Sequence, residues 1–260
     1  MFSTMSVSLS ERVKYKAIIL DLDDTTVVAG KKSFPTSRVT KAIAKAKERI
    51  HVGIATARPF LEAKPVMDHL KLSGPCVINN GTQIYDPVLK KMIREVELPA
   101  GALEKVYALC QKHHLQIFLY EGKLDYEYFG TTIPQKALSI YLPKIDPKKI
   151  DEFVKLFAVE SHIHVQKIPA WDARFMAIHI AHAEATKLHG IVEVARILDI
   201  TTEEIIGVGD GYNDFPLLMA CGLKIAMGNA VPELKAIADF VAPTVSDDGV
   251  ATIIEKFILP

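Results

Sequence analysis

Runs rich in Ile and Val alternate with segments of helical period over the N-terminal third of the chain. The apolar run 15–22 predicts a buried strand, and Pro35, followed by two hydroxyl residues, predicts the start of a helix. The apolar positions on one face of that helix are Val39, Ala42, Ile43 and Ala46. We further expect a strand at 51–56, a helix at 59–72 that Pro65 either kinks or begins, and a strand at 75–80. This alternation is typical of parallel strands joined by crossover helices.

The pattern changes after Gly81. The middle of the chain predicts a hairpin at 84–98 turning near 86–87, helices at 99–114 and 147–157, and extended segments at 116–120, 124–129, 162–168 and 174–180. From residue 184 onward, strand and helix alternate again. We therefore predict an α/β fold with a Rossmann-like parallel-sheet core, formed by 1–82 and 183–260, and an α+β cap domain inserted at 83–182.

Composition limits the choice of partners. Lys plus Arg and Asp plus Glu both number 31, so the net charge gives no reason to expect a nucleic acid or an anionic membrane. The three cysteines lie far apart without a CxxC pair, which predicts neither a disulfide framework nor a zinc site. No apolar stretch reaches the roughly eighteen residues of a membrane span, and residues 1–14 are polar. We expect a cytoplasmic monomer or homodimer with a short, poorly ordered leader.

Two acidic side chains follow the first predicted strand. Asp21 and Asp23 lie two residues apart, so they share a side at the carboxyl end of a strand, where ligands bind in open α/β sheets. Two carboxylates this close repel each other unless a cation or a proton lies between them. An isolated pair of this kind is more often turn chemistry than a ligand site.

A second acidic element changes that balance. The apolar run 205–208 predicts a strand, and the motif GDGYND follows it at 209–214. The glycines beside Asp210 let the backbone turn sharply, and Asn213 and Asp214 can cap the next helix or contact a ligand. Oxygen ligands of this kind suit Mg²⁺, which usually takes one or two carboxylates alongside waters and substrate phosphate.

Two further polar residues lie where a phosphate group needs partners. Thr56 ends the second predicted strand, and Lys187 lies at the start of a predicted helix. Alone, a Thr at a strand end is usually turn chemistry, and a Lys in a first helical turn is usually solvated. With the two acidic elements, however, they form one ordered set on one framework of strands and helices.

This ordered set resembles the haloacid dehalogenase superfamily, specifically its Cof-type phosphatases with a large α/β cap. The resemblance covers nearly the whole chain and rests on DLDDT at 21–25, Thr56, Lys187 and GDGYND at 209–214. It implies that Asp21 is the nucleophile and Asp23 the general acid and base. By the same resemblance, the phosphate-binding residues are Thr56, Ala57, Lys187 and Asn213, and the Mg²⁺ ligands are Asp21, the Asp23 backbone carbonyl, Asp210 and Asp214.

The sequence departs from the common family pattern at two positions. Many Cof-type members have Gly where this chain has Asp24 and Ala57. Neither change removes a group to which the resemblance gives a catalytic role. Asp24 does add a carboxylate beside the expected metal site.

We therefore predict a Mg²⁺-dependent phosphatase that hydrolyses a small phosphorylated metabolite, with a sugar phosphate favoured, through an aspartyl-phosphate intermediate. A sugar phosphomutase of the same superfamily and a catalytically silent phosphometabolite sensor are the alternatives. The cap is expected to determine substrate specificity and to exclude water when it closes. Packing inside the cap is the favoured interpretation for its candidate contact residues, which are Tyr120, Tyr126, Tyr128, Trp171 and His179.

Overall fold

A parallel sheet organises the larger lobe of the computed structural model, which describes residues 14–30, 33–132, 134–158, 161–170, 172 and 174–259. Its strand order is β13-β12-β11-β1-β2, and every neighbouring pair is parallel. The strands are β1 (Ala17–Leu20), β2 (His51–Ile54), β11 (Ile205–Gly209), β12 (Leu223–Ala226) and β13 (Phe240–Val241). All residues of β1 are buried, as expected for a central parallel strand covered on both faces.

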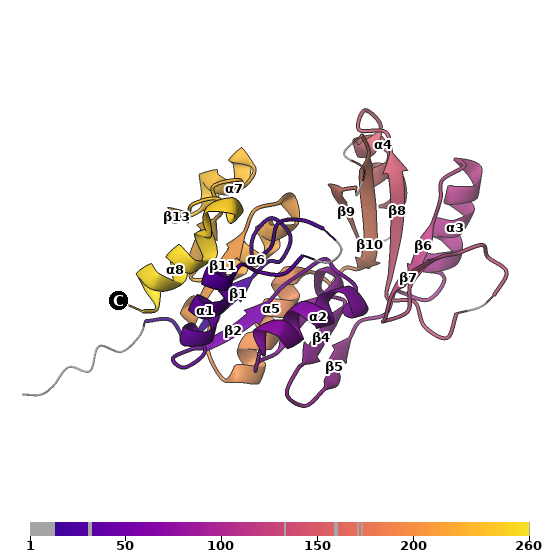
Figure 1. Cartoon of the computed structure of the whole chain (residues 1–260). Coiled ribbons are helices and arrows are strands. Elements are labelled where there is room, and N and C mark those ends of the chain that lie inside the picture. Colours follow the sequence, from indigo (N-terminus) through magenta and orange to yellow (C-terminus); the bar gives the residue numbers. More distant parts are fainter. Residues whose placement is uncertain are drawn as a thin grey trace, which may run out of the picture.

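Helices from both ends of the chain pack around this sheet (Figure 1). They are α1 (Ser37–Ala46), α2 (Phe60–Leu70), α5 (Lys187–Leu198), α6 (Phe215–Ala220), α7 (Pro232–Ile237) and α8 (Gly249–Phe257). The buried residues of α1 are the four of the predicted apolar stripe, and the Thr36 hydroxyl accepts a hydrogen bond from the Val39 amide at the start of the helix. Pro65 lies inside α2, so the alternative that it begins the helix is wrong.

The predicted hairpin belongs to a small second sheet. β4 (Gln83–Asp86) and β5 (Lys91–Glu95) pair antiparallel, and β4 also pairs with β3 (Cys76–Ile78). A parallel bridge between Ala55 and Val77 connects this sheet to the end of β2. Ile84 is part of the hydrophobic core of the larger lobe, whereas Leu98 is part of a separate core. The domain boundaries at 82/83 and 182/183 remain predictions. Along the chain, apolar residues up to β5 pack in the core of the larger lobe, and those from Leu98 pack in the core of the smaller lobe.

The smaller lobe, which we term the cap, contains a five-stranded antiparallel sheet in the order β7-β6-β8-β10-β9. Its elements are α3 (Ala102–Lys112), β6 (Phe118–Tyr120), β7 (Asp125–Glu127), β8 (Ser139–Ile145), α4 (Ile150–Phe157), β9 (Ile163–Pro169) and β10 (Met176–His182). The sequence analysis missed β8, the central strand of this sheet. Pro143 lies within it, and proline argues against a central strand. The register between β8 and β10 shifts at this point, which accommodates the proline.

The two faces of the cap sheet differ in character because side chains alternate along each strand. Ile140, Ile178 and Ile180 point to one face and belong to the cap's hydrophobic core, to which α3 and α4 also contribute. Tyr141 and His179 have the opposite parity and line a cavity between the lobes. The polar face of the cap sheet therefore looks toward the larger lobe.

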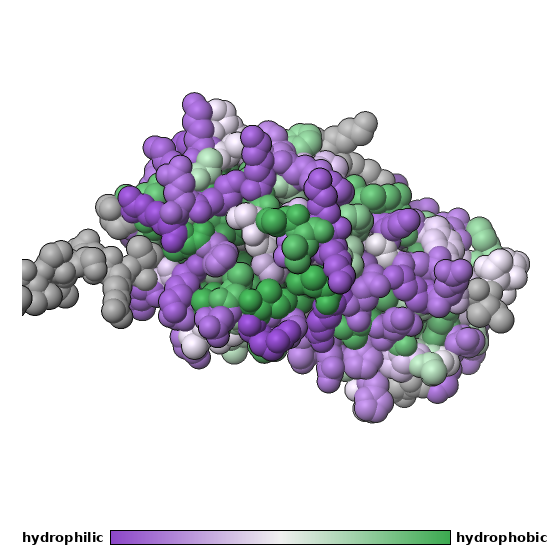
Figure 2. All heavy atoms as spheres, turned by 90° about the horizontal axis from the view of Figure 1, so that it is seen from below, coloured by the Kyte–Doolittle hydropathy of each residue, from purple (hydrophilic) through white to green (hydrophobic). Residues whose placement is uncertain are grey.

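Most of the surface seen from below is hydrophilic, with smaller apolar clusters between charged side chains (Figure 2). Of the helices in the described part of the chain, none is both long and apolar enough to cross a membrane. Cys76, Cys110 and Cys221 are buried free thiols, and burial raises the pKa of each to about 12.

Candidate active site

The carboxyl ends of β1, β11 and β2 bring the predicted acidic elements to one edge of the parallel sheet. Leu20 at the end of β1 lies opposite Val208 of β11, and the Asp21 amide donates to the Val208 carbonyl at 2.9 Å. Asp21 and Asp210, 189 positions apart in the sequence, thus follow neighbouring strands at the same edge. Thr56 follows β2, on the other side of β1.

Lys187 joins the two acidic elements. Its Nζ donates to Asp21 Oδ1 and to Asp214 Oδ1, both at 2.6 Å, and its side chain is 1% exposed. It is the first residue of α5, where the preceding Thr186 caps the helix by accepting from the His189 amide. Lys187 is therefore a buried charge with two buried partners, unlike the solvated lysine that usually occupies such a position.

Asp214 is fully committed to local partners. Its Oδ1 accepts from Lys187, and its Oδ2 accepts the amide protons of Asp210 and Gly211, both at 2.9 Å. A carboxylate with both oxygens occupied is suited to hold Lys187 and the turn that carries Asp210. Gly209 is required at this turn, because a Cβ there would lie 2.4 Å from the Asp214 carboxyl carbon.

The electrostatics of this edge favour a cation. Burial, together with the negative charge of Asp214, raises the pKa of Asp21 well above its usual value. Burial and Asp214 also raise the pKa of Asp210 to about 7, although the Thr25 hydroxyl donates to Asp210 Oδ1 at 2.7 Å. Oxygens of Asp21, Asp210 and Asp214 lie within 4.8 Å of one another, and Lys187 supplies a single positive charge among them. This oxygen donor set fits a hard divalent cation such as Mg²⁺.

Asp23 is held by Arg58, an arginine that has no role among the predicted site residues. Arg58 donates to Asp23 through Nε at 2.8 Å and Nη2 at 2.7 Å, a two-pronged contact that fixes the carboxylate plane. The Arg58 side chain is 3% exposed and that of Asp23 is 32% exposed, so the acid remains accessible from the cavity. The available signal was the position of Arg58 two residues after Thr56, at the same strand end.

The predicted phosphate-binding residues occupy different depths. Thr56 is 1% exposed, and its hydroxyl accepts from the Arg58 amide at 3.1 Å. Ala57 and Asn213 line the cavity, and the Asn213 side chain donates to Asn80 Oδ1 at 3.4 Å. Thr56 is therefore the deepest of the three and its role in phosphate binding stays a prediction, whereas Ala57 and Asn213 lie at the cavity surface.

Asp24 occupies a backbone position that suits the glycine of the common family pattern. Its φ is 56°, in the left-handed region that Asp tolerates better than most residues. Its side chain accepts from the Ala29 amide at 3.0 Å, and its carbonyl accepts from the Asn229 side chain at 2.7 Å. The departure is thus accommodated locally, and Asp24 adds negative charge to the cavity wall.

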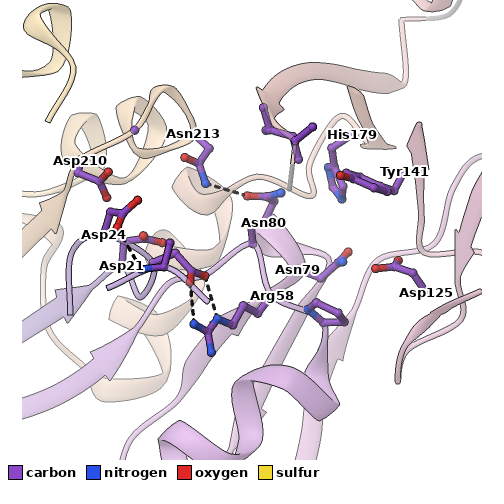
Figure 3. A pocket seen from close by; sticks show the side chains of 17 residues that line it. Asp21, Asp24, Arg58, Asn79, Asn80, Asp125, Tyr141, His179, Asp210 and Asn213 are labelled. Atoms are coloured by element: carbon purple, nitrogen blue, oxygen red, sulfur yellow. Dashed lines mark hydrogen bonds and ion pairs between the residues drawn. The ribbon is translucent and has the colours of Figure 1, made fainter. Parts of the chain in front are cut away.

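A cavity of about 260 Å³ separates this edge from the cap, and Figure 3 shows side chains of both lobes pointing into it. His179 is the one candidate cap residue among the described lining residues, so it lies where a substrate could contact it. Tyr120 is buried between Gln83 and the Phe60 amide, Tyr128 packs in the cap core, Tyr126 is 37% exposed, and Trp171 lies outside the described residues. The sequence analysis missed Asp125 and Tyr141, which also line the cavity.

A family model for haloacid dehalogenase-like hydrolases matches residues 18–152 and 123–254. The chain belongs to this family. Together the matched segments span both lobes, and the prediction of a Cof-type member with an α/β core is confirmed.

Curated relatives over nearly the full length carry phosphatase names. The chain is 24% identical over 250 residues, covering 96% of this chain and 98% of the relative, to 5-amino-6-(5-phospho-D-ribitylamino)uracil phosphatase of Bacillus subtilis. It is 27% identical over 245 residues, covering 94% and 98%, to phosphoglycolate phosphatase of Methanobrevibacter smithii. These relatives are phosphoric monoester hydrolases of the family, and their named substrates differ from one another.

Solved structures share the fold. A phosphatase of the superfamily from Bacteroides thetaiotaomicron superposes with a TM-score of 0.81 at 20% identity, covering 98% of this chain and 99% of that one. A subclass IIB sugar phosphatase gives a TM-score of 0.76 at 20% identity, covering 93% and 98%. At this identity the likeness establishes the arrangement of core and cap.

Proposed function

We propose that this protein is a Mg²⁺-dependent phosphatase that hydrolyses a small phosphorylated metabolite, with a sugar phosphate favoured, through an aspartyl-phosphate intermediate on Asp21. The contact of Lys187 with both Asp21 and Asp214 carries this proposal. It keeps a buried carboxylate at the cavity wall beside a cation, which is how a site can accept a phosphate dianion without strong repulsion. Family membership and the phosphatase names of the relatives support the same reaction class.

In the proposed mechanism a carboxylate oxygen of Asp21 attacks phosphorus in line with the leaving oxygen. The new O–P bond replaces the bond to the leaving group, so hydrolysis is divided into formation and breakdown of an acyl phosphate. Lys187 stabilises negative charge on the transferring group, and Ala57 and Asn213 are available to position it.

Asp23 is assigned the proton transfers. It donates its proton to the leaving alkoxide in the first step and removes one from the attacking water in the second. The two bonds from Arg58 hold the Asp23 carboxyl group in one orientation for both steps.

Asp21, Asp210 and the Asp23 backbone carbonyl would hold Mg²⁺, with Asp214 supporting the turn that carries Asp210. When bound, the ion would offset the charge of Asp21 and of the phosphate oxygens.

Phosphate release from a metabolite panel, measured with Mg²⁺ and after exhaustive chelation, tests the proposal. We expect release that chelation abolishes and Mg²⁺ restores. Asp21→Asn should lower kcat by roughly four orders of magnitude or more, because it removes the nucleophile while keeping the side-chain shape. Mass spectrometry of protein trapped with labelled substrate should place the phosphoryl group on Asp21. Label on another residue, or full activity without metal, contradicts the mechanism.

The same panel separates the alternatives. A phosphomutase would convert a sugar phosphate into an isomeric phosphate with little free orthophosphate. A silent sensor would bind a phosphometabolite without turnover. Free orthophosphate that disappears in Asp23→Asn supports the hydrolase, because only an enzyme needs that residue as an acid and base.

A further inference from the structure

The cap side of the cavity carries a row of polar side chains with a fixed geometry. His179 of β10 lies directly opposite Tyr141 of β8 in the antiparallel register, so both side chains point to the same face. Asp125 of β7 reaches the same cavity from the other end of the sheet. Figure 3 shows the Tyr141 ring beside His179, with the Asp125 carboxylate nearby.

His179 has one buried ring nitrogen that lacks a hydrogen-bond partner among the described residues. The residue is 4% exposed, and the unpaired nitrogen is Nε2. Burial, with a smaller contribution from His164, lowers the pKa of His179 to about 3, so the imidazole is neutral at physiological pH. Buried polar atoms in native proteins are almost always satisfied, so an unpaired one on a cavity wall indicates a ligand or water.

The neighbouring groups of this wall have related properties. Burial, followed by the charge of Asp125, raises the pKa of Tyr141 to about 12, so its hydroxyl stays protonated. Asp125 forms no ion pair within the described part of the chain, and burial, followed by Glu62, raises its pKa to about 6. The cap wall thus presents one carboxylate and two neutral hydrogen-bonding groups.

Among the described residues that line the cavity, positive charge lies only on the opposite wall. Arg58 is the one Lys or Arg among the described lining residues, and its guanidinium is already bound by Asp23. A leaving group bearing a carboxylate or a second phosphate would face Asp125 without a compensating cation, which is costly in a buried site. Hydroxyl groups, by contrast, can donate to Asp125 and exchange hydrogen bonds with Tyr141 and His179.

We propose that Asp125, Tyr141 and His179 form a specificity site that selects an uncharged, hydroxyl-bearing leaving group, a sugar or polyol, and rejects leaving groups carrying an additional anion. The inference rests on the proposed phosphatase function and adds the residues that choose the substrate. The cavity, at about 260 Å³, is near the lower end of small-molecule sites, which suits one compact metabolite.

Steady-state kinetics with Mg²⁺ on four substrates tests this assignment. Glucose 6-phosphate and sorbitol 6-phosphate carry hydroxyl groups, phosphoglycolate carries a carboxylate, and p-nitrophenyl phosphate carries neither. We expect the wild type to prefer both hydroxylated substrates over phosphoglycolate in kcat/KM by roughly tenfold or more.

Two conservative variants and one matched control connect the preference to the residues. Asp125→Asn and Tyr141→Phe should each lower kcat/KM for the hydroxylated substrates by roughly five- to fiftyfold and leave p-nitrophenyl phosphate within about twofold. Asp125→Asn should also raise the relative rate on phosphoglycolate, because it removes the repelling charge. Tyr126→Phe, on the same strand as Asp125 but absent from the cavity lining, should change none of these ratios.

The outcomes separate the two claims. A wild-type preference for phosphoglycolate, or equal losses on all four substrates in both variants, overturns the specificity assignment and leaves the phosphatase intact. Absence of phosphate release from every substrate, p-nitrophenyl phosphate included, refutes the proposed function and this inference with it.

Discussion

The two walls of the cavity differ in whether their polar groups are paired within the protein. At the edge of the parallel sheet, Lys187 donates to both Asp21 and Asp214, and Arg58 is bound to Asp23. On the cap wall, among the described residues, half-buried Asp125 has no ion pair and the Nε2 atom of buried His179 has no hydrogen-bond partner. The phosphoryl group is common to every substrate, so its partners can be arranged in advance. The leaving group differs, and the cap leaves hydrogen-bonding capacity for it.

The wall at the edge of the parallel sheet, whose polar groups are already paired with one another, is termed the prearranged wall. Lys187→Met is its strongest test. The variant should lose roughly three orders of magnitude in kcat, because the cation that offsets charge on phosphate is removed. It should also lower the free energy of unfolding by about 3–5 kcal/mol, because Asp21 and Asp214 are left buried without their partner.

A double variant separates these two effects. Adding Asp214→Asn to Lys187→Met should recover stability in chemical denaturation without recovering turnover. Lys16→Met, which removes a half-exposed partner of Glu204, is the surface control and should be near neutral in both measurements. Normal turnover per folded molecule in Lys187→Met would mean that the lysine is purely structural.

Arg58→Met tests whether the two hydrogen bonds from Arg58 orient the Asp23 carboxyl group for proton transfer. Without the two bonds from Arg58, Asp23 is free to rotate, so kcat on alkyl phosphates should fall by roughly 10- to 100-fold. The loss on p-nitrophenyl phosphate should be smaller, because that leaving group departs without protonation and only the second step then needs Asp23. Arg38→Met, which breaks an exposed pair with Glu255, is the control. Equal losses on both substrates would mean that Arg58 acts in a step common to both and not through protonation of the leaving group.

The acidic edge should also make Mg²⁺ binding depend on pH. The pKa of Asp210 is raised to about 7, first by burial and then by Asp214, so a proton competes with the ion below that pH. The dissociation constant from calorimetry should be nearly constant above about pH 8 and rise by up to about tenfold per pH unit below 7. Asp24→Asn should move the onset to lower pH, because the charge of Asp24 contributes to the raised pKa. Equal affinity at pH 6 and pH 8 would contradict this account.

The contrast between the walls also explains what the sequence could predict. Asp21 and Asp210 follow strands of the parallel sheet, and parallel strands bring their carboxyl ends together whatever their separation in sequence. These two residues were therefore predictable as a pair, whereas Lys187 begins α5, which follows the cap strand β10, and was assigned its role by the family resemblance. The bond between Arg58 and Asp23 was not, because it depends on the conformations of two long-range neighbours and not on a strand period.

The cap resisted prediction for a different reason. Its central strand β8 contains Pro143, so a local rule argued against it, and the compensating register shift depends on pairing with β10. Without β8, Tyr141 could not be placed opposite His179. Asp125 likewise comes to the cavity only through the antiparallel pairing of β7 with β6. Cap residues that face a ligand share their residue types with those that pack, and only the sheet register separates them.

Asp125→Asn offers the smallest and most specific test of the contrast. Because burial raises the folded-state pKa of Asp125 from 3.8 to about 6, the folded protein holds this proton more tightly than the unfolded chain does. The ionised carboxylate therefore lowers stability as the pH rises from about 4 to 6, and the loss stays constant at higher pH. The variant should raise the free energy of unfolding by up to about 3 kcal/mol near pH 7.5 and change it little near pH 3.5, as measured by urea denaturation of metal-free protein. Asp151→Asn, at an exposed carboxylate paired with Lys167, should be near neutral at both pH values. A gain in stability together with a loss of selectivity for hydroxylated substrates would show that the cap retains a destabilising charge for recognition. Destabilisation at both pH values would instead mean that the Asp125 carboxylate has a structural partner in the protein, which contradicts the proposed role in substrate binding.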